Sequence, residues 1–375
     1  MAGPRPIAAA QLRTLDALLT IVALGFAAAI VTSAQPIGAG RLDQDPLDLP
    51  ALRRLGLDAE RQGRTAEAEK LLDFVSRRTW RDGPTEAWLV RTRLQQGRYD
   101  DAFRSADSIL RRDDDGATRP ILYAMFTAAA AYPDARPALE ARLATSPDWR
   151  GDVLTDLAVH GDPAGAGEVF ADLANGPSPP TPSEYAPYVE RLVAVGDYPA
   201  ARTAWERIAR PGDAMRRALA GDDFSAPSDQ TAFTWGTSSG AGWSGEVGPS
   251  PDRPNRRALR IDYDGFSAPR LPERLLVLGP GRYRLAWRES ADPRWRARLS
   301  WRLRCADTDE ALASEALAST TPPGPSTGID RTMDFAVPAT GCLGQWLQLT
   351  ASPAERRDPV TAWFEDFEVR APPDR

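Results

Sequence analysis

The chain has 375 residues, of which 42% are hydrophobic, and 46 basic against 52 acidic residues give it a formal net charge of −6. This length and apolar content allow two folded parts, and the acidic balance excludes the basic footprint of a nucleic-acid-binding protein. Lys70 is the single lysine, and it lies outside any Gly-Lys-Ser/Thr motif, so the sequence holds no P-loop. The use of arginine for every other basic residue indicates a GC-rich bacterial genome.

The first feature in chain order is an uncharged, apolar stretch near the N-terminus. No charged residue lies between Ala17 and Gly40, and Arg5 and Arg13 precede the stretch. Its most apolar part, Ala17–Ala34, approaches the ~20 residues that cross a bilayer. The basic flank keeps the start of the chain in the cytoplasm and sends the remainder outside.

We therefore expect a cytoplasmic segment at 1–16, a transmembrane signal anchor at 17–36 and a linker at 37–46. This predicts a single-pass protein of the bacterial inner membrane with the bulk of the chain in the periplasm. Two alternatives stay open. Thr32-Ser33-Ala34 would suit cleavage of a signal peptide, and the stretch could be a buried helix, although such a helix normally shows a polar face.

Small residues then recur at intervals of 31 to 35 residues, at Gly63, Gly97, Ala130, Gly161 and Gly196. Five residues after each of them stands an alanine, namely Ala68, Ala102, Ala135, Ala166 and Ala201. Periods of this size mark stacked helical hairpins. We expect two antiparallel helices per unit, joined at the small residue because bulk cannot fit there, with the alanine at the helix crossing.

The best-preserved unit, Gly97-Arg98-Tyr99-Asp100-Asp101-Ala102, resembles the tetratricopeptide repeat, and Gly196-Asp197-Tyr198-Pro199-Ala200-Ala201 repeats it. Ala130 and Gly161 stand in degenerate copies, with Pro133 and Pro163 expected in the first turn of the second helices. The resemblance covers 47–215 and implies an α-solenoid of about five hairpins whose groove binds a protein partner. An unrelated helical bundle with accidental spacing is the alternative.

Helical periodicity stops in a linker at 216–228, and short apolar runs separated by Gly and Pro follow. Eight such runs predict an antiparallel β-sandwich over 229–372, because no helical crossovers interrupt them. The expected strands are Ala232–Trp235, Ala258–Tyr263, Arg274–Leu278, Arg282–Arg288, Leu299–Cys305, Thr332–Val337, Gln345–Thr350 and Ala362–Val369.

Three stretches of this part resemble the galactose-binding-like jelly rolls that include many carbohydrate-binding modules. They are Phe233-Thr234-Trp235, Leu278-Gly279-Pro280-Gly281-Arg282-Tyr283-Arg284-Leu285 and Trp363-Phe364-Glu365-Asp366-Phe367-Glu368-Val369. The resemblance implies a jelly-roll fold with a glycan as ligand. It also makes Asp366 a candidate for a structural calcium site, although the other oxygen ligands that calcium needs are not identifiable. Apart from this calcium, the sequence predicts no cofactor.

The two cysteines, Cys305 and Cys342, both lie in the predicted sandwich. Outside the cytoplasm such a pair is expected to form a disulfide, and two reduced core thiols are the alternative. Trp243 and Trp295 lie in expected loops of the same domain, where exposed aromatic rings could stack on sugar faces. Core packing is the competing explanation for both tryptophans.

Catalytic motifs are weak. Gly236-Thr237-Ser238-Ser239-Gly240 fits the nucleophile-elbow pattern, but the only histidine, His160, lies in the repeat array, where capping or packing explains it. One histidine and two cysteines cannot build the usual zinc sites. A glycosidase needs only two carboxylates, and Glu365 and Asp366 are the pair to test for one.

The sequence thus predicts a non-enzymatic periplasmic adaptor in surface or exopolysaccharide assembly. Its repeats would bind a protein partner, and its sandwich would bind a glycan or a second protein. A glycan-binding protein that acts alone and a polysaccharide hydrolase are the alternatives.

Overall fold

The computed structural model describes residues 45–79, 81–112, 116–209, 221–222, 224, 231–235, 239–291, 298–316 and 328–371. The expected anchor at 17–36 and Trp295 lie outside these residues. Among the helices that are described, none is both long and apolar enough to cross a membrane. The chain divides into two compact units, Met1–Pro180 and Thr181–Arg375.

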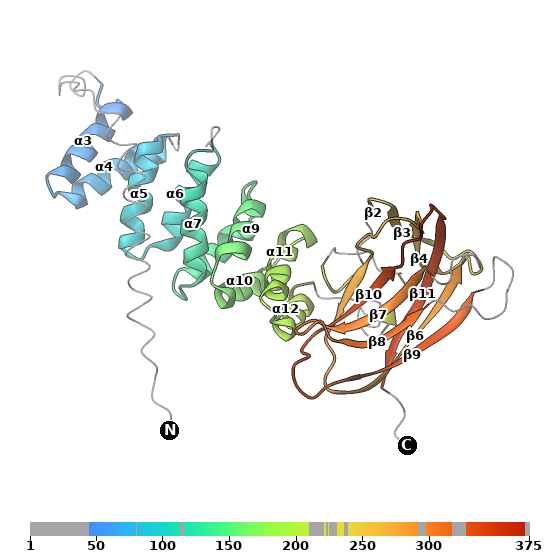
Figure 1. Cartoon of the computed structure of the whole chain (residues 1–375). Helices are drawn as coiled ribbons and strands as arrows, with labels where there is room; N and C mark the ends of the chain where they lie inside the picture. The colour runs from blue at the N-terminus through green and yellow to red at the C-terminus, as the bar shows by residue number, and fades with distance from the viewer. Residues whose placement is uncertain are drawn as a thin grey trace, which may run out of the picture. The chain divides into compact units, whose positions relative to one another are not determined.

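The described helical region consists of ten helices packed in pairs, coloured blue to green in Figure 1. Eight belong to the first unit: α3 (Leu49–Arg61), α4 (Thr65–Arg78), α5 (Gly83–Gln95), α6 (Tyr99–Leu110), α7 (Arg119–Ala130), α8 (Arg136–Leu143), α9 (Arg150–His160) and α10 (Pro163–Asn175). The second unit begins with α11 (Pro182–Ala194) and α12 (Tyr198–Ala209). The five hairpins coincide with the five expected repeats.

Three of the repeat glycines end their helices in the left-handed region, with φ of 76° at Gly63, 70° at Gly97 and 80° at Gly196. After each, the next amide donates back into the last helical turn, as Arg98 does to the Arg93 carbonyl oxygen at 2.8 Å. A Cβ at these glycines would meet no atom within 4 Å. The expectation that a larger side chain could not fit is therefore wrong at these three positions. Glycine is required for its backbone conformation.

The two degenerate copies are different, because at their glycines neighbouring atoms leave no space for a larger side chain. A Cβ on Gly161 would lie 2.5 Å from the Leu157 carbonyl oxygen, and a Cβ on Gly165 would lie 2.7 Å from the Ala130 carbonyl oxygen. Pro163 begins α10 as expected. Pro133 was expected in the first turn of a helix, but it precedes α8 and lies in the turn before it, so this expectation is wrong.

Small and aromatic side chains are buried within the hairpins. All five repeat alanines are at most 2% exposed, which fits their expected place at the helix crossings. Phe103 of α6 lies edge-on to Phe126 of α7, with 5.3 Å between ring centroids, and Phe126 stacks on Trp149 at 5.0 Å. Trp149 also donates its indole N–H to Asp107 Oδ1 at 2.8 Å. Aromatic packing thus joins the second, third and fourth hairpins.

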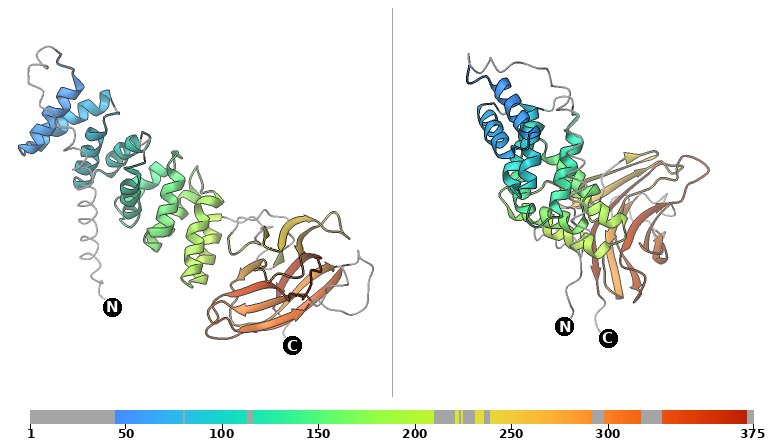
Figure 2. Two further views of the ribbon diagram at one scale, coloured as in Figure 1. Left: turned by 45° about the horizontal axis from the view of Figure 1, so that its top comes forward. Right: turned by 90° about the vertical axis from the view of Figure 1, so that its left-hand side faces the viewer.

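The second unit continues into two antiparallel sheets that form a β-sandwich (Figures 1 and 2). Sheet A has the order β2-β3-β4-β11-β6-β9, with β1 paired to β11. Its strands are β1 (Gly221–Asp222), β2 (Ser239–Gly240), β3 (Trp243–Pro249), β4 (Arg257–Tyr263), β6 (Gly281–Ala291), β9 (Ile329–Val337) and β11 (Val360–Arg370). Sheet B has the order β5-β10-β7-β8, with β5 (Glu273–Leu276), β7 (Leu299–Cys305), β8 (Ala311–Ala316) and β10 (Gln345–Ala351).

Seven of the eight expected strands are present, and their alternation is the reason. β7, for example, buries every second side chain from Leu299 to Cys305. The expected strand at Ala232–Trp235 is instead an irregular segment. β3 and β8 were not expected, because glycine and proline interrupt the pattern of the first and the second is an alanine-rich run without alternation.

Aromatic rings fill the space between the sheets. Trp301 of β7 is fully buried and meets three rings edge-on, with centroids at 5.0 Å for Phe364, 5.1 Å for Phe367 and 5.5 Å for Trp235. Trp301 belongs to sheet B, Phe364 and Phe367 belong to sheet A, and Trp235 belongs to the irregular segment at 231–235. The cluster therefore joins three parts of the sandwich in one contact network.

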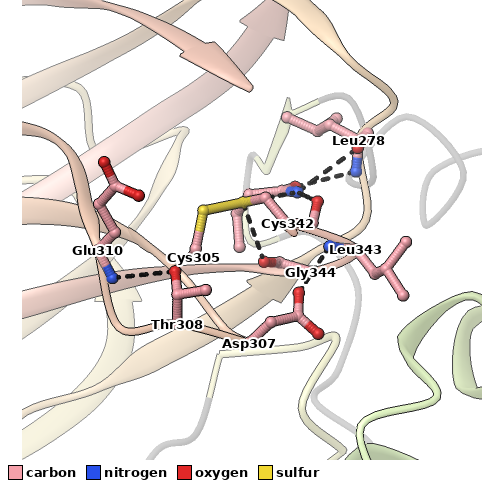
Figure 3. Close-up of a disulfide and its surroundings, with 9 residues drawn as sticks. Leu278, Cys305, Asp307, Thr308, Glu310, Cys342, Leu343 and Gly344 are labelled. Atoms are coloured by element: carbon pink, nitrogen blue, oxygen red, sulfur yellow. Dashed lines mark hydrogen bonds between the residues drawn. A yellow bond between two sulfur atoms is a disulfide. The ribbon is translucent and has the colours of Figure 1, made fainter. Parts of the chain in front are cut away.

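The expected disulfide is confirmed between Cys305 and Cys342 (Figure 3), whose Cα atoms are 5.2 Å apart. Cys305 ends β7, and Cys342 lies in the loop before β10. The bond closes a separation of 37 residues and lies next to the turn that joins β7 to β8.

Substituting Gly97 with alanine tests whether backbone conformation alone explains the repeat glycines. We expect Gly97→Ala to lower the free energy of unfolding by roughly 1–2 kcal/mol, because the left-handed region is costly for an L-residue. Gly83→Ala is the matched control, since Gly83 also has an open Cβ position but no positive φ. Urea denaturation measures both, and equal stability of the two variants would contradict the explanation.

Candidate functional site

The centre of sheet A is strand β11, which pairs with β4 on one side and β6 on the other. Its register against β6 shifts between Glu365 and Glu368, where β11 carries one extra residue. Asp366 lies in this bulge with a φ of 54°. The extra residue lets Phe364 and Phe367 both point into the core, and it leaves Trp363 and Glu365 on the outer face.

Trp363 forms an aromatic platform on this outer face. It is half-buried, and its neighbours Ala362 and Phe364 are fully buried on the core side. The guanidinium carbon of Arg260, its cross-strand partner on β4, lies 6.0 Å from the Trp363 ring centroid. Arg260 is held in turn by Glu246 and Asp262, each at 3.0 Å. The ring is therefore bordered by exposed charged groups.

A buried ion network supports the same strand next to Trp363. Glu365 is only 2% exposed, and its Oε1 lies 2.9 Å from Arg253 Nη2 and 3.6 Å from Arg288 Nε. The Ser250 hydroxyl oxygen also lies 3.2 Å from Glu365 Oε1. Arg253 and Ser250 belong to the loop that follows β3, so this loop is tied down over β11 and β6.

Asp252 of that loop completes the network. Its Oδ2 accepts hydrogen bonds from Arg288 Nη2 at 2.8 Å and from the Gly328 amide at 2.9 Å, and its Oδ1 accepts from the Ser250 hydroxyl at 2.9 Å. Burial by itself raises the pKa of Asp252, but these hydrogen bonds outweigh it and lower the pKa to about 2. The carboxylate is thus ionised over the whole physiological range.

Two polar oxygens next to Trp363 are buried without a hydrogen-bond partner among the described residues. One is Oε2 of Glu365, which is on the same face of β11, and the other is the hydroxyl of Ser290, the cross-strand partner of Trp363 on β6. Leaving such a group unpaired costs about 1–3 kcal/mol.

Of the residues selected from the sequence, Glu365 belongs to this site, whereas Trp243 and His160 lie elsewhere. Trp243 begins β3 instead of lying in a loop, and its ring is half-buried against the core, so packing accounts for its position. A Cβ on Gly240 would lie 2.6 Å from its indole nitrogen. His160 ends α9, where its Nδ1 lies 3.0 Å from Asp156 Oδ1.

The surroundings of Asp366 do not fit a calcium ion. Its Oδ2 lies 2.6 Å from Arg253 Nη2, so a guanidinium neutralises the carboxylate. In the part of the chain that the structure describes, no three acidic, histidine or cysteine side chains come together as a metal site. The role that the structure shows for Asp366 is to hold the bulge of β11 to the loop after β3.

Trp363 is the functional candidate that the sequence analysis missed, and a signal for it was available. Val360, Ala362 and Phe364 are apolar at alternate positions, which places Trp363 on the opposite face. The signal for Glu365 is weaker, because the bulge interrupts the alternation directly after it. Ser250 and Asp252, more than 100 residues upstream, give no local signal at all.

Comparison with known proteins finds likeness only among solved structures. No protein-family model and no curated protein matches the chain. The C-terminal sandwich is similar to the K1 cleaved adhesin domain of Lys-gingipain from Porphyromonas gingivalis W83, at 16% identity over 40% of this chain and 94% of that one, with a TM-score of 0.28.

It is also similar to the C-terminal family 22 carbohydrate-binding module of Clostridium thermocellum Xyn10B, at 11% identity over 40% of this chain and 91% of that one, with a TM-score of 0.26. A third similar structure is TmCBM61 in complex with β-1,4-galactotriose, at 10% identity over 36% of this chain and 88% of that one, with a TM-score of 0.24.

The low pKa of Asp252 predicts how stability depends on pH. Because the unfolded carboxyl titrates near pH 4, its stabilising effect is fully present above about pH 4 and is lost as the pH falls through about 2. We expect Asp252→Asn to lower the free energy of unfolding by roughly 2 kcal/mol at neutral pH and by much less near pH 2.

Denaturation of both proteins across this pH range measures the difference. Asp330→Asn is the matched control, because Asp330 Oδ1 also bonds Arg288, at 3.0 Å, but the side chain is 84% exposed. We expect the control to lower the free energy of unfolding by less than about 0.5 kcal/mol. A pH-independent effect of Asp252→Asn would argue against ionisation as its cause.

Proposed function

We propose that this protein is a non-enzymatic, membrane-anchored periplasmic adaptor, with a sandwich of the galactose-binding-like jelly-roll type that binds a glycan on the outer face of sheet A. The observation that carries the proposal is the Trp363 platform. A sugar presents an apolar C–H face that suits an aromatic ring, and its hydroxyls both donate and accept hydrogen bonds. Arg260, Asp262 and Glu246 offer both kinds of partner next to the ring.

The unpartnered oxygens of Glu365 and Ser290 support the same proposal. Each is an acceptor to which a hydroxyl could donate, and both are next to Trp363 in the strand register. Both are buried, so a ligand reaches them only when neighbouring side chains shift.

The remaining parts of the proposal concern the repeats and the cellular location. We assign the five hairpins to the tetratricopeptide-repeat type and a protein partner to their groove, in surface or exopolysaccharide assembly or export. The Cys305–Cys342 disulfide supports an oxidising compartment, because such bonds are rare in the cytosol. The anchor at 17–36 rests on the sequence alone.

Alanine substitution of Trp363 tests the glycan site. We expect Trp363→Ala to weaken binding to polysaccharides on a glycan array by at least about thirtyfold, equivalent to roughly 2 kcal/mol for loss of a central aromatic anchor. Trp346→Ala is the matched control. Trp346 is also a half-buried tryptophan, on the outer face of sheet B, and Arg304 lies 5.9 Å from its ring centroid.

Equal loss of polysaccharide binding in both tryptophan variants, or unchanged binding by Trp363→Ala, would show that Trp363 is not the binding platform. Glu365→Gln, tested together with polysaccharide hydrolysis assays, addresses the alternative of a hydrolase. Turnover by the natural protein that Glu365→Gln abolishes would replace a binding role with a catalytic one.

The orientation in the membrane is tested with reporter fusions. We expect alkaline phosphatase to be active when fused to the C-terminus and inactive when fused after residue 16, because the enzyme folds only outside the cytoplasm. Arg5 and Arg13 hold the start of the chain inside. An inactive C-terminal fusion in cells that still synthesise it would refute the periplasmic location.

A further inference from the structure

The fifth hairpin, α11–α12, belongs to the same compact unit as the sandwich, and the described residues show contacts between them at two places. The first contact is the irregular segment at 231–235. The Ala232 amide donates to Glu190 Oε1 of α11 at 2.8 Å, and the Ala232 carbonyl oxygen accepts from the Leu275 amide of β5 at 2.7 Å. Phe233 then packs on Trp205 of α12, with 5.4 Å between centroids. One short segment thus bonds to a helix and to an edge strand.

The second contact lies at the start of α12. Tyr198 is only 7% exposed, and a Cβ on Gly344 would lie 2.7 Å from its Cγ and 3.1 Å from its Cβ. These atoms are at the base of the tyrosine side chain, so they cannot move aside without shifting the helix. Gly344 is therefore a glycine because α12 approaches its backbone closely.

The loop that carries Gly344 is fixed by the disulfide and by bonds to residues that follow Cys305 (Figure 3). The Gly344 carbonyl oxygen accepts from the Ala306 amide at 2.8 Å, and the Leu343 amide donates to Asp307 Oδ2 at 2.6 Å. Gln345 Nε2 donates to the Cys342 carbonyl oxygen at 3.0 Å. The disulfide therefore joins the same two segments, 305–307 and 342–345, that these hydrogen bonds connect.

We propose that the disulfide-bonded loop 342–344 is a seat that locks the fifth helical hairpin onto the sandwich, and that reduction of the disulfide unlocks it. A dithiol reductant would transfer two electrons to the S–S bond, which breaks. Two protons go to the sulfurs of Cys305 and Cys342, and the dithiol closes to a disulfide. Without the covalent link the seat under Tyr198 keeps only its hydrogen bonds to Ala306, Asp307 and Gln345, and among the described residues the contact at 231–235 becomes the firmer attachment of the hairpin.

Amide hydrogen exchange of the full-length protein in detergent tests this proposal. In the oxidised protein, we expect Gly344→Ala to speed exchange in α12 at least tenfold more than in β7 and β10, because the added methyl group displaces Tyr198 while the disulfide stays intact. Gly248→Ala is the matched control, since Gly248 lies in β3 and a Cβ there meets no atom within 4 Å. This control should leave the rate of amide exchange in α12 unchanged.

Reduction of the natural protein with tris(2-carboxyethyl)phosphine, which also opens the disulfide, should give the same pattern as Gly344→Ala. The proposal is overturned if α12 exchanges no faster after reduction. It is also overturned if β7 and β10 accelerate as much as α12, because the disulfide would then stabilise the sandwich as a whole and not seat the hairpin.

Discussion

The bulge at Asp366 is the constraint on which the rest of the sandwich depends. Strict alternation along β11 would place Phe364 and Phe367 on opposite faces, yet Trp301 contacts both rings in the core. One extra residue with a left-handed backbone restores Phe367 to the core side. Aspartate tolerates that conformation better than most residues, and its carboxylate reaches Arg253. A single backbone irregularity thus fixes the core and determines which side chains of β11 face outward.

The ion network explains why a strand that carries buried charges is nevertheless stable in this position. Burying Glu365 without partners would be strongly unfavourable, but Arg253 and Arg288 both approach its Oε1. Asp252 in turn neutralises Arg288 and bonds the Gly328 amide, so the loop after β3 is tied to two strands at once. The network therefore borders the platform at Trp363 on one side.

The sequence predicts the parts of this molecule whose physics is local. The repeat period predicts five hairpins, but three of its glycines serve backbone conformation where steric crowding was expected, and a single sequence cannot distinguish the two causes. Alternating residues predict β7 and β10 almost to the residue, whereas the glycine-containing β3 lacks such a pattern. The bulge of β11 depends on its pairing with β6, and the contact between Ser250 and Glu365 joins residues 115 apart. No window of the sequence reveals such contacts, so Glu365 was considered only as a catalytic carboxylate and Trp363 was missed although it followed the alternation.

The same distinction applies to the boundary between the two units. The repeat signal runs without interruption through all five hairpins, and the Schellman turn at Gly196 is the same as those at Gly63 and Gly97. Yet the fifth hairpin belongs to the compact unit of the sandwich. Its membership is determined by Tyr198 against Gly344 and by Phe233 against Trp205, and both pairs join residues that no repeat period relates. A repeat period therefore locates hairpins, while the unit to which a hairpin belongs follows from its side-chain contacts with distant segments.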